Sequence, residues 1–236
     1  MKTVMVAHRG AQQVAPENTL TAFKLAIKTG FKAVECDVQL SKDGHLVIIH
    51  DETVDRTSDG VGWVSQLTRD QIKQLTIGDT EHIPSLREVY YLVVVQAKRR
   101  LILEIKADTE LHANKTAQAL VRFIGHIPRK NRRFIEVHSF WYSALKYFKA
   151  HCPTITTAAI INGGFDGEQI ISIAQDTASN GVSLGYEFLS AKIVRQCHHS
   201  RLFVDTWAIS DGTVLRRLRP FGLNAVVENF SGKTIN

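Results

Sequence analysis

Charged side chains alternate with aliphatic ones in two short runs, residues 33–40 and 101–106. Both runs are typical of buried β-strands, because aliphatic residues dominate one set of alternating positions. Successive side chains of a strand point to opposite faces, so the charged groups share the face that the aliphatic groups leave free. The side chains predicted to converge there are Glu35, Asp37, Glu104 and Lys106.

The negative charge of three converging carboxylates must be compensated. Buried carboxylates are protonated, paired with cations or bound to a metal ion, because an uncompensated charge is costly to remove from water. Oxygen ligands near strand ends favour a hard divalent ion, Mg²⁺ or Ca²⁺. Such an ion would bind Glu35, Asp37 and Glu104. A structural network in which Lys106 and Arg9 neutralise the acids is an equally good interpretation of the spacing.

Two histidines, His8 and His50, each follow a short apolar run. They are therefore predicted at the carboxyl ends of strands, where parallel barrels assemble their active sites. Imidazole titrates near neutral pH, so the pair could act as general base and general acid on a phosphorus centre. Arg9 and Lys106 would supply positive charge to a phosphate. A lone histidine is more often structural, but two beside three acids favour catalysis.

Eight apolar runs alternate with helical stretches along the chain and must position these groups. The predicted strands are residues 4–7, 33–40, 101–106, 134–138, 155–161, 181–184, 202–207 and 224–228. The predicted helices are residues 19–28, 85–98, 110–125, 142–151, 168–179, 191–199 and 213–218. Alternating strands and helices favour a parallel α/β sheet, and eight of them in 236 residues favour a closed (β/α)8 TIM barrel.

Two stretches depart from a plain barrel. Residues 41–84 are rich in Asp, Thr and Gly and are interpreted as an elaborated loop after the second strand. Only residues 229–236 follow the eighth predicted strand, so the last helix is expected to be reduced. No repeat or Pro/Ser-rich linker interrupts the chain, and residues 1–236 are therefore interpreted as a single domain.

Composition places the chain among globular proteins, since 44% of its residues are hydrophobic and 22% are charged. No apolar run approaches the ~18 residues that span a bilayer, and no secretory segment is evident, so a cytoplasmic protein is expected. Three widely spaced cysteines argue against disulfides. The net charge of +6 raises the question of whether the protein binds nucleic acid. Its basic clusters at 98–100, 129–133 and 216–219 precede strands, away from the predicted site, so no nucleic-acid partner is expected.

Six short motifs, taken together and in order, resemble those of the glycerophosphodiester phosphodiesterases of the cytosolic bacterial type. The motifs are Ala7-His8-Arg9-Gly10, Pro16-Glu17-Asn18-Thr19, Glu35-Cys36-Asp37-Val38, His50-Asp51 with Asp55-Arg56-Thr57, Ile83-Pro84-Ser85-Leu86 and Leu103-Glu104-Ile105-Lys106. The resemblance is strongest over residues 4–106. It extends thinly to Ser139-Phe140 and Trp207.

The resemblance implies a metal-dependent barrel, like that of phosphatidylinositol phosphodiesterases, which hydrolyses glycerophosphodiesters to sn-glycerol 3-phosphate and an alcohol. By position it implies metal ligands Glu35, Asp37 and Glu104, a base His8, an acid His50, phosphate-binding Arg9 and Lys106, and Trp207 as an apolar wall for substrate. The cofactor would be Mg²⁺ or Ca²⁺, and the partner a small-molecule substrate. The nucleophile stays open between water and a glycerol hydroxyl that forms a cyclic phosphate.

Other activities fit the same residues. A lysophospholipase D-like or sphingomyelinase D-like phosphodiesterase would need an apolar surface for an acyl chain. A catalytically silent barrel would bind an anion, but the presence of all five metal and acid/base residues argues against it. A reduced last helix would leave one flank of the barrel less covered, which favours a homodimer contact there.

The end of the eighth strand departs from the family pattern. The family usually has a Thr-Asp pair there, whereas this chain has Glu228-Asn229. Glu228 would either add an inward acid near the metal or substrate, or simply meet solvent. Glu136 and His138 alternate as Glu35 and Asp37 do, so they too are expected inside, although the resemblance gives them no role.

Overall fold

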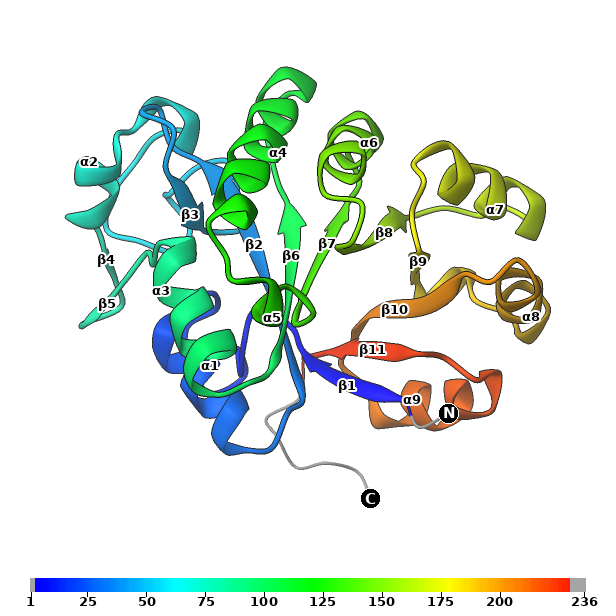
Figure 1. The fold of residues 1–236 in the computed structure, drawn as a ribbon. Coiled ribbons are helices and arrows are strands. Elements are labelled where there is room, and N and C mark those ends of the chain that lie inside the picture. Colours follow the sequence, from blue (N-terminus) through cyan, green and yellow to red (C-terminus); the bar gives the residue numbers. More distant parts are fainter. Residues whose placement is uncertain (1–2, 230–236) are drawn as a thin grey trace.

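A closed barrel of eight parallel strands is the centre of the molecule in the computed structural model, which describes residues 3–229 (Figure 1). The strands are β1 (Val4–Ala7), β2 (Ala33–Leu40), β6 (Arg100–Ile105), β7 (Ile135–Ser139), β8 (Thr156–Ile161), β9 (Gly181–Gly185), β10 (Phe203–Ile209) and β11 (Ala225–Glu228). Each neighbours the next in chain order, and β1 closes the ring by pairing with both β11 and β2. The expected TIM barrel and its eight strands are confirmed, with bounds that differ by at most two residues.

Helices cover the outside of this ring (Figure 1). The longer ones are α1 (Leu20–Lys28), α4 (Glu110–Gly125), α6 (Tyr142–His151), α7 (Gly167–Asp176), α8 (Ala191–His199) and α9 (Gly212–Leu218). The expected helix 85–98 is α3 (Leu86–Tyr90) followed by the π-helical turns of η2 (Tyr91–Gln96). Short segments that the sequence analysis did not expect are α5 (Arg129–Arg132), η3 (Tyr186–Phe188) and η4 (Arg219–Phe221).

The elaborated loop after β2 has elements and a small core of its own. They are β3 (Leu46–Ile48), η1 (Val64–Gln66), α2 (Arg69–Lys73), β4 (Thr76–Ile77) and β5 (Glu81–His82). β3 pairs antiparallel with β2, so the loop is anchored directly to the barrel. Buried aliphatic residues such as Val54 and Ile72 hold it together. The expected reduction of the last helix concerns residues 230–236, which lie outside the described part.

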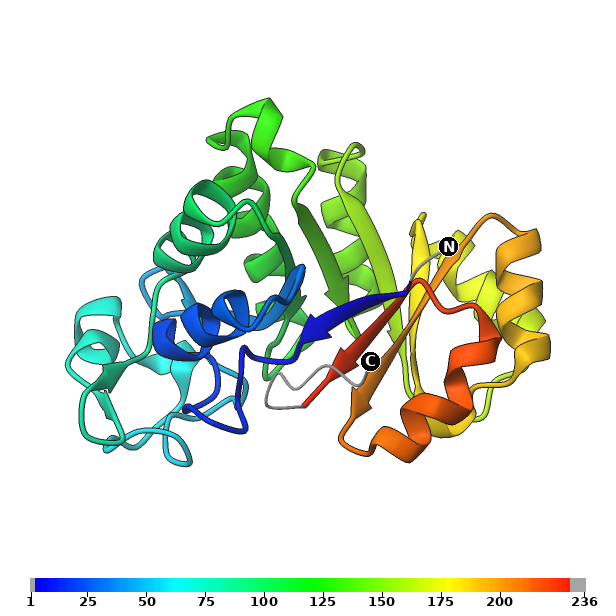
Figure 2. The same cartoon turned by 90° about the horizontal axis from the view of Figure 1, so that it is seen from below.

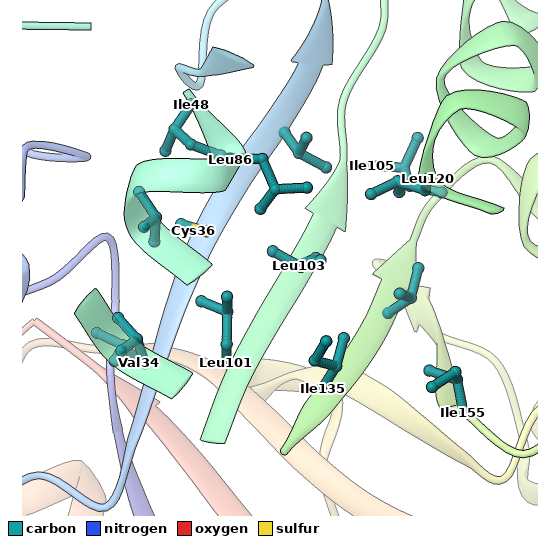
Figure 3. Packing of buried hydrophobic residues seen from close by; sticks show 14 of the residues in the cluster. Val34, Cys36, Ile48, Leu86, Leu101, Leu103, Ile105, Leu120, Ile135 and Ile155 are labelled. Carbon is teal, nitrogen blue, oxygen red and sulfur yellow. The ribbon is translucent and has the colours of Figure 1, made fainter. Parts of the chain in front are cut away.

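Two separate apolar layers fix the strands. On the outer face, alternate side chains of β2 and β6 such as Val34 and Leu103 pack beneath α3 and α4 (Figure 3). Inside the barrel a smaller cluster contains Val6, Ile102 and Val227. This cluster includes Ile102 of β6, two residues before Glu104 on the same face, so part of the barrel interior below the site is apolar.

The first and last strands lie side by side, with β1 next to β11 (Figure 2).

After β1 the chain turns sharply at Gly10, whose φ is +81°. A Cβ at this position would lie 2.7 Å from the backbone carbon of Ala22 in α1. Only glycine fits, because the turn needs both a left-handed conformation and close contact with the helix. Among residues 3–229, no helix combines the length and apolar character needed to cross a bilayer.

Candidate active site

The three predicted metal ligands come together at the carboxyl ends of β2 and β6. Asp37 and Glu104 are register partners, and Glu35 precedes Asp37 on the same face. Ligand oxygens of all three lie within 4.8 Å of one another. Asp37 is fully buried, and one oxygen of Glu35 and one of Asp37 are buried without accepting a hydrogen bond. The expectation that these acids point inward together is confirmed, and their free oxygens are the donors that a hard divalent cation needs.

Two cations border the acids. Lys106 Nζ lies 2.5 Å from Glu104 Oε1 and 3.6 Å from Asp37 Oδ1. Arg9 Nε lies 3.2 Å from Asp37 Oδ2, and the Arg9 backbone N–H donates to Glu35 Oε2 at 3.1 Å. The ion-pair network that the sequence offered as one interpretation is therefore present around Asp37 and Glu104, whereas no cationic side chain within the described residues pairs with Glu35.

The pKa values of these acids diverge because of burial and repulsion. Burial, followed by repulsion from Asp37 and Glu104, raises the pKa of Glu35 well above its usual value. Burial also raises the pKa of Glu104, although Lys106 opposes this. Burial disfavours the charged form of Asp37 too, but Lys106 and Arg9 outweigh it and lower its pKa. Repelling, desolvated carboxylates of this kind favour an added cation.

His8 is oriented by two amides. Its Nδ1 lies 2.6 Å from Asn229 Oδ1 and 2.9 Å from Gln12 Nε2. Asn229 donates its Nδ2 to Ser210 Oγ at 2.8 Å, which leaves its Oδ1 to accept from His8. Gln12 Nε2 also donates to Asn229 Oδ1 at 2.5 Å. With its proton on Nδ1, His8 would donate to the same oxygen and present an unprotonated Nε2 at 3.9 Å from Glu35 Oε2. Burial and then Arg9 lower the pKa of His8 to about 4, so it is neutral at physiological pH.

A chain of ion pairs orients His50. Its Nδ1 lies 2.7 Å from Asp51 Oδ1, and Arg56 donates to both oxygens of Asp51 at 2.5 and 2.9 Å. Arg56 also donates to Glu17 Oε1 at 2.8 Å, and Arg9 donates to the same oxygen at 2.9 Å. The loop after β1, which carries Arg9 and Glu17, is thereby joined to the loop that carries His50 and Arg56. Hydrogen bonding and charge from Arg56 and His50 keep the pKa of Asp51 far below its usual value.

A cavity of about 630 Å³ opens where these groups meet. Seven of the eight predicted site residues line it: His8, Arg9, Glu35, His50, Glu104, Lys106 and Trp207. Asp37 lies buried beside them. The Trp207 indole is pinned by donating to Ser183 O at 3.2 Å, and its ring meets Phe140 edge-on at 5.6 Å between centroids. The cavity therefore has an ionic side and an aromatic side.

The sequence model of the glycerophosphoryl diester phosphodiesterase family matches residues 8–233. The chain belongs to this family. The glycerophosphodiester phosphodiesterase of Caldanaerobacter subterraneus subsp. tengcongensis is 31% identical, over 100% of this chain and 98% of that protein. The resemblance inferred from the motifs is thus confirmed, and so is the enzyme class.

Solved structures of the family share the fold. A phosphodiesterase of Oleispira antarctica, in complex with the product sn-glycerol 3-phosphate, is 31% identical with a TM-score of 0.89. The match covers 98% of this chain and 94% of that one. A glycerophosphodiester phosphodiesterase of Thermotoga maritima, 23% identical over 99% of this chain and 96% of its own, superposes with a TM-score of 0.81.

Other polar residues lie differently from their prediction or were missed. Glu228 does not face the site: its neighbour Val227 lines the cavity, so the strand's alternation turns Glu228 outward, where burial raises its pKa to about 7. Glu136 and His138 do point inward, as expected. Asn18 is not among the predicted site residues, yet its amide donates a 2.8 Å hydrogen bond to Asp37 while the neighbouring Thr19 caps α1. Its place in the Pro16-Glu17-Asn18-Thr19 motif was the only signal.

Proposed function

We propose that the protein hydrolyses glycerophosphodiesters to sn-glycerol 3-phosphate and an alcohol, in a metal-dependent reaction with histidine acid/base catalysis. The observation that carries the proposal is one cavity lined by two oriented histidines, two cations and the carboxylates of Glu35 and Glu104, with Asp37 buried beside them. Acid/base groups on either side of a cationic phosphate site are what phosphodiester cleavage requires.

Glu35, Asp37 and Glu104 are the proposed metal ligands, and Mg²⁺ or Ca²⁺ the proposed ion. Their unsatisfied oxygens and mutual repulsion fit a hard divalent cation. Such an ion, when bound, supplies positive charge to the developing oxyanion and lowers the pKa of an attacking oxygen. Asn18 would hold Asp37 in place through its amide.

His8 is the proposed base, since its neutral Nε2 faces the acids. His50 is the proposed acid, since it lines the cavity and is held there by Asp51. Arg9 and Lys106 would bind the phosphate oxygens. Trp207 would form the wall against which the glycerol or the leaving group lies. The nucleophile, water or a neighbouring glycerol hydroxyl, is left to experiment.

Two relatives support the substrate class. The Caldanaerobacter protein is named a glycerophosphodiester phosphodiesterase, and the match covers 98% of its length. The Oleispira structure contains the product sn-glycerol 3-phosphate. Both are 31% identical to this chain. The proposal extends their chemistry to the present site residues.

The test is release of glycerol 3-phosphate from glycerophosphocholine and other headgroup diesters, with EDTA and with Mg²⁺ or Ca²⁺ restored. We expect activity that EDTA abolishes and the metal restores, and its loss in Glu104→Gln. Glu110→Gln, on the exposed start of α4, is the matched control and should be fully active. No product with any headgroup or metal would favour the silent anion-binding barrel.

A lysophospholipase D-like activity is the second candidate, because the aromatic side of the cavity reaches solvent. Phe140 is 40% exposed and Phe188 37% exposed, and both line the cavity. An acyl chain could lie along these rings. Comparing kcat/KM for glycerophosphocholine and lysophosphatidylcholine decides between them, since a preference for the lysolipid would make the acyl substrate the physiological class.

Three further expectations remain predictions. They are a single domain over residues 1–236 with an insertion near 41–84, a cytoplasmic location, and a homodimer. Size-exclusion chromatography with light scattering tests the last of these directly.

A further inference from the structure

A second cluster of metal-binding groups lies inside the barrel. Glu136 and His138 of β7 and Asp205 of β10 each offer a ligand atom within 4.8 Å of the others. All three side chains are buried, with His138 only 3% exposed. None of them belongs to the acid cluster of the proposed reaction. His138 is the register partner of Glu104, so the two clusters are neighbours in the same barrel.

One polar atom in this cluster has no hydrogen-bond partner. His138 Nε2 is buried, accepts and donates no hydrogen bond, and lies 3.5 Å from Glu136 Oε2. A buried imidazole nitrogen normally has a partner, because leaving it unsatisfied costs about 1–3 kcal/mol. Nitrogen and oxygen ligands bind Zn²⁺ at about 2.0–2.2 Å, which puts two ligands of a tetrahedral ion about 3.4 Å apart. The nitrogen and oxygen are already at this separation.

Arg100 keeps the cluster from carrying excess negative charge. Its Nη1 lies 3.0 Å from Glu136 Oε1, which leaves Oε2 to face His138. The second acid, Asp205, completes a set of one nitrogen and two carboxylate donors. His138 also lines the cavity of the proposed active site, so an ion could reach the cluster from solvent through that opening.

We propose that Glu136, His138 and Asp205 form a separate binding site for a divalent transition metal, with Zn²⁺ the best match. Imidazole beside carboxylates is the ligand chemistry of Zn²⁺, whereas the all-oxygen set of Glu35, Asp37 and Glu104 suits Mg²⁺ or Ca²⁺. The two clusters therefore differ in the ion they prefer, although Zn²⁺ offered without a competing ion would bind the carboxylate cluster as well. The proposal does not depend on the reaction that the first cluster supports.

The competing explanation is a closed network of ion pairs. A protonated His138 between Glu136 and Asp205, with Arg100 outside, would satisfy the same groups without any metal. Both explanations predict that removing His138 destabilises the protein. Only the metal site predicts that it changes the number of bound ions.

The experiment is equilibrium dialysis of the full chain against Zn²⁺, with ions per chain counted by elemental analysis. We expect two ions in the wild type, one in His138→Ala and one in a Glu35→Gln/Glu104→Gln double variant. His151→Ala, which removes an exposed histidine at the end of α6, is the matched control for surface binding and should keep two.

Asp205→Asn guards against misfolding of the histidine variant. It keeps the shape of the side chain and should weaken the second ion by roughly tenfold or more, leaving the first unchanged. Two ions retained in His138→Ala would overturn the proposal. So would a single ion in the wild type that disappears in the double variant, since the ion-pair network would then account for the cluster.

Discussion

The amide that holds His8 offers the sharpest test of the proposed base. Asn229 stands where the family pattern has an acid, and its Oδ1 lies 2.6 Å from His8 Nδ1. Asn229→Asp replaces a neutral acceptor with a carboxylate at almost the same place. A negative charge favours the imidazolium form, so the substitution raises the pKa of His8 from its present value of about 4.

The size of the shift follows from distance and burial. Opposite charges about 4 Å apart attract by about 4 kcal/mol at an effective dielectric constant near 20, which corresponds to about three pKa units. The His8 side chain is only 14% exposed, so solvent screens little of this. Burial of the new carboxylate opposes its ionisation, and we therefore expect a rise of roughly one to three units.

The assay is the pH dependence of kcat/KM for a glycerophosphodiester between about pH 4 and about pH 9, with saturating metal. A base works when unprotonated, so raising its pKa moves the acidic limb of the profile upward by the same amount. Asn162→Asp, on another part of the cavity lining, controls for added charge and should move the limb less. If Asn229→Asp leaves the limb where the wild type has it, His8 is not the base.

Other substitutions probe the remaining parts of the structure. Arg56→Ala should lower kcat/KM by roughly tenfold to a hundredfold by releasing Asp51 and His50, whereas Arg129→Ala on α5 should have no effect; equal effects would refute the orienting network. Leu103→Ala should lower the free energy of unfolding in urea by about 2–5 kcal/mol, because the side chain is fully buried, and the 67%-exposed Leu111→Ala should barely change it. A substrate whose glycerol hydroxyl beside the ester is methylated should not be cleaved if the reaction passes through a cyclic phosphate, and efficient hydrolysis would establish attack by water.

Alternation within single strands made the barrel and the acid cluster predictable. In β2 and β6 the aliphatic side chains face the helices, so Glu35, Asp37 and Glu104 had to face inward wherever the strands lay in the ring. The same alternation governs β11, but there the residues that face inward are the odd-numbered ones, so Glu228 faces outward. Val227 is the inward residue of β11, and the short run around it carried no clear alternation.

Contacts between distant parts of the chain could not be predicted in this way. The pairing of His8 with Asn229 joins residues 221 positions apart, and Asp205 meets His138 across the barrel. Such contacts depend on strand register and closure, which no local pattern encodes. Alternation in residues 202–207 would have marked Asp205 as inward, but without a partner it had no evident role.

The pairing of β1 with β11 determines when the barrel can close during synthesis and folding of the chain. The barrel closes only when its last strand docks against its first, a contact between the most distant strands of the chain. Asn229 follows that strand directly, and His8 follows β1. During synthesis the proposed base therefore gains its orienting partner only after nearly the whole chain has emerged. Nascent or truncated chains that lack β11 should be inactive even if their acid cluster has formed, so activity reports that folding is complete.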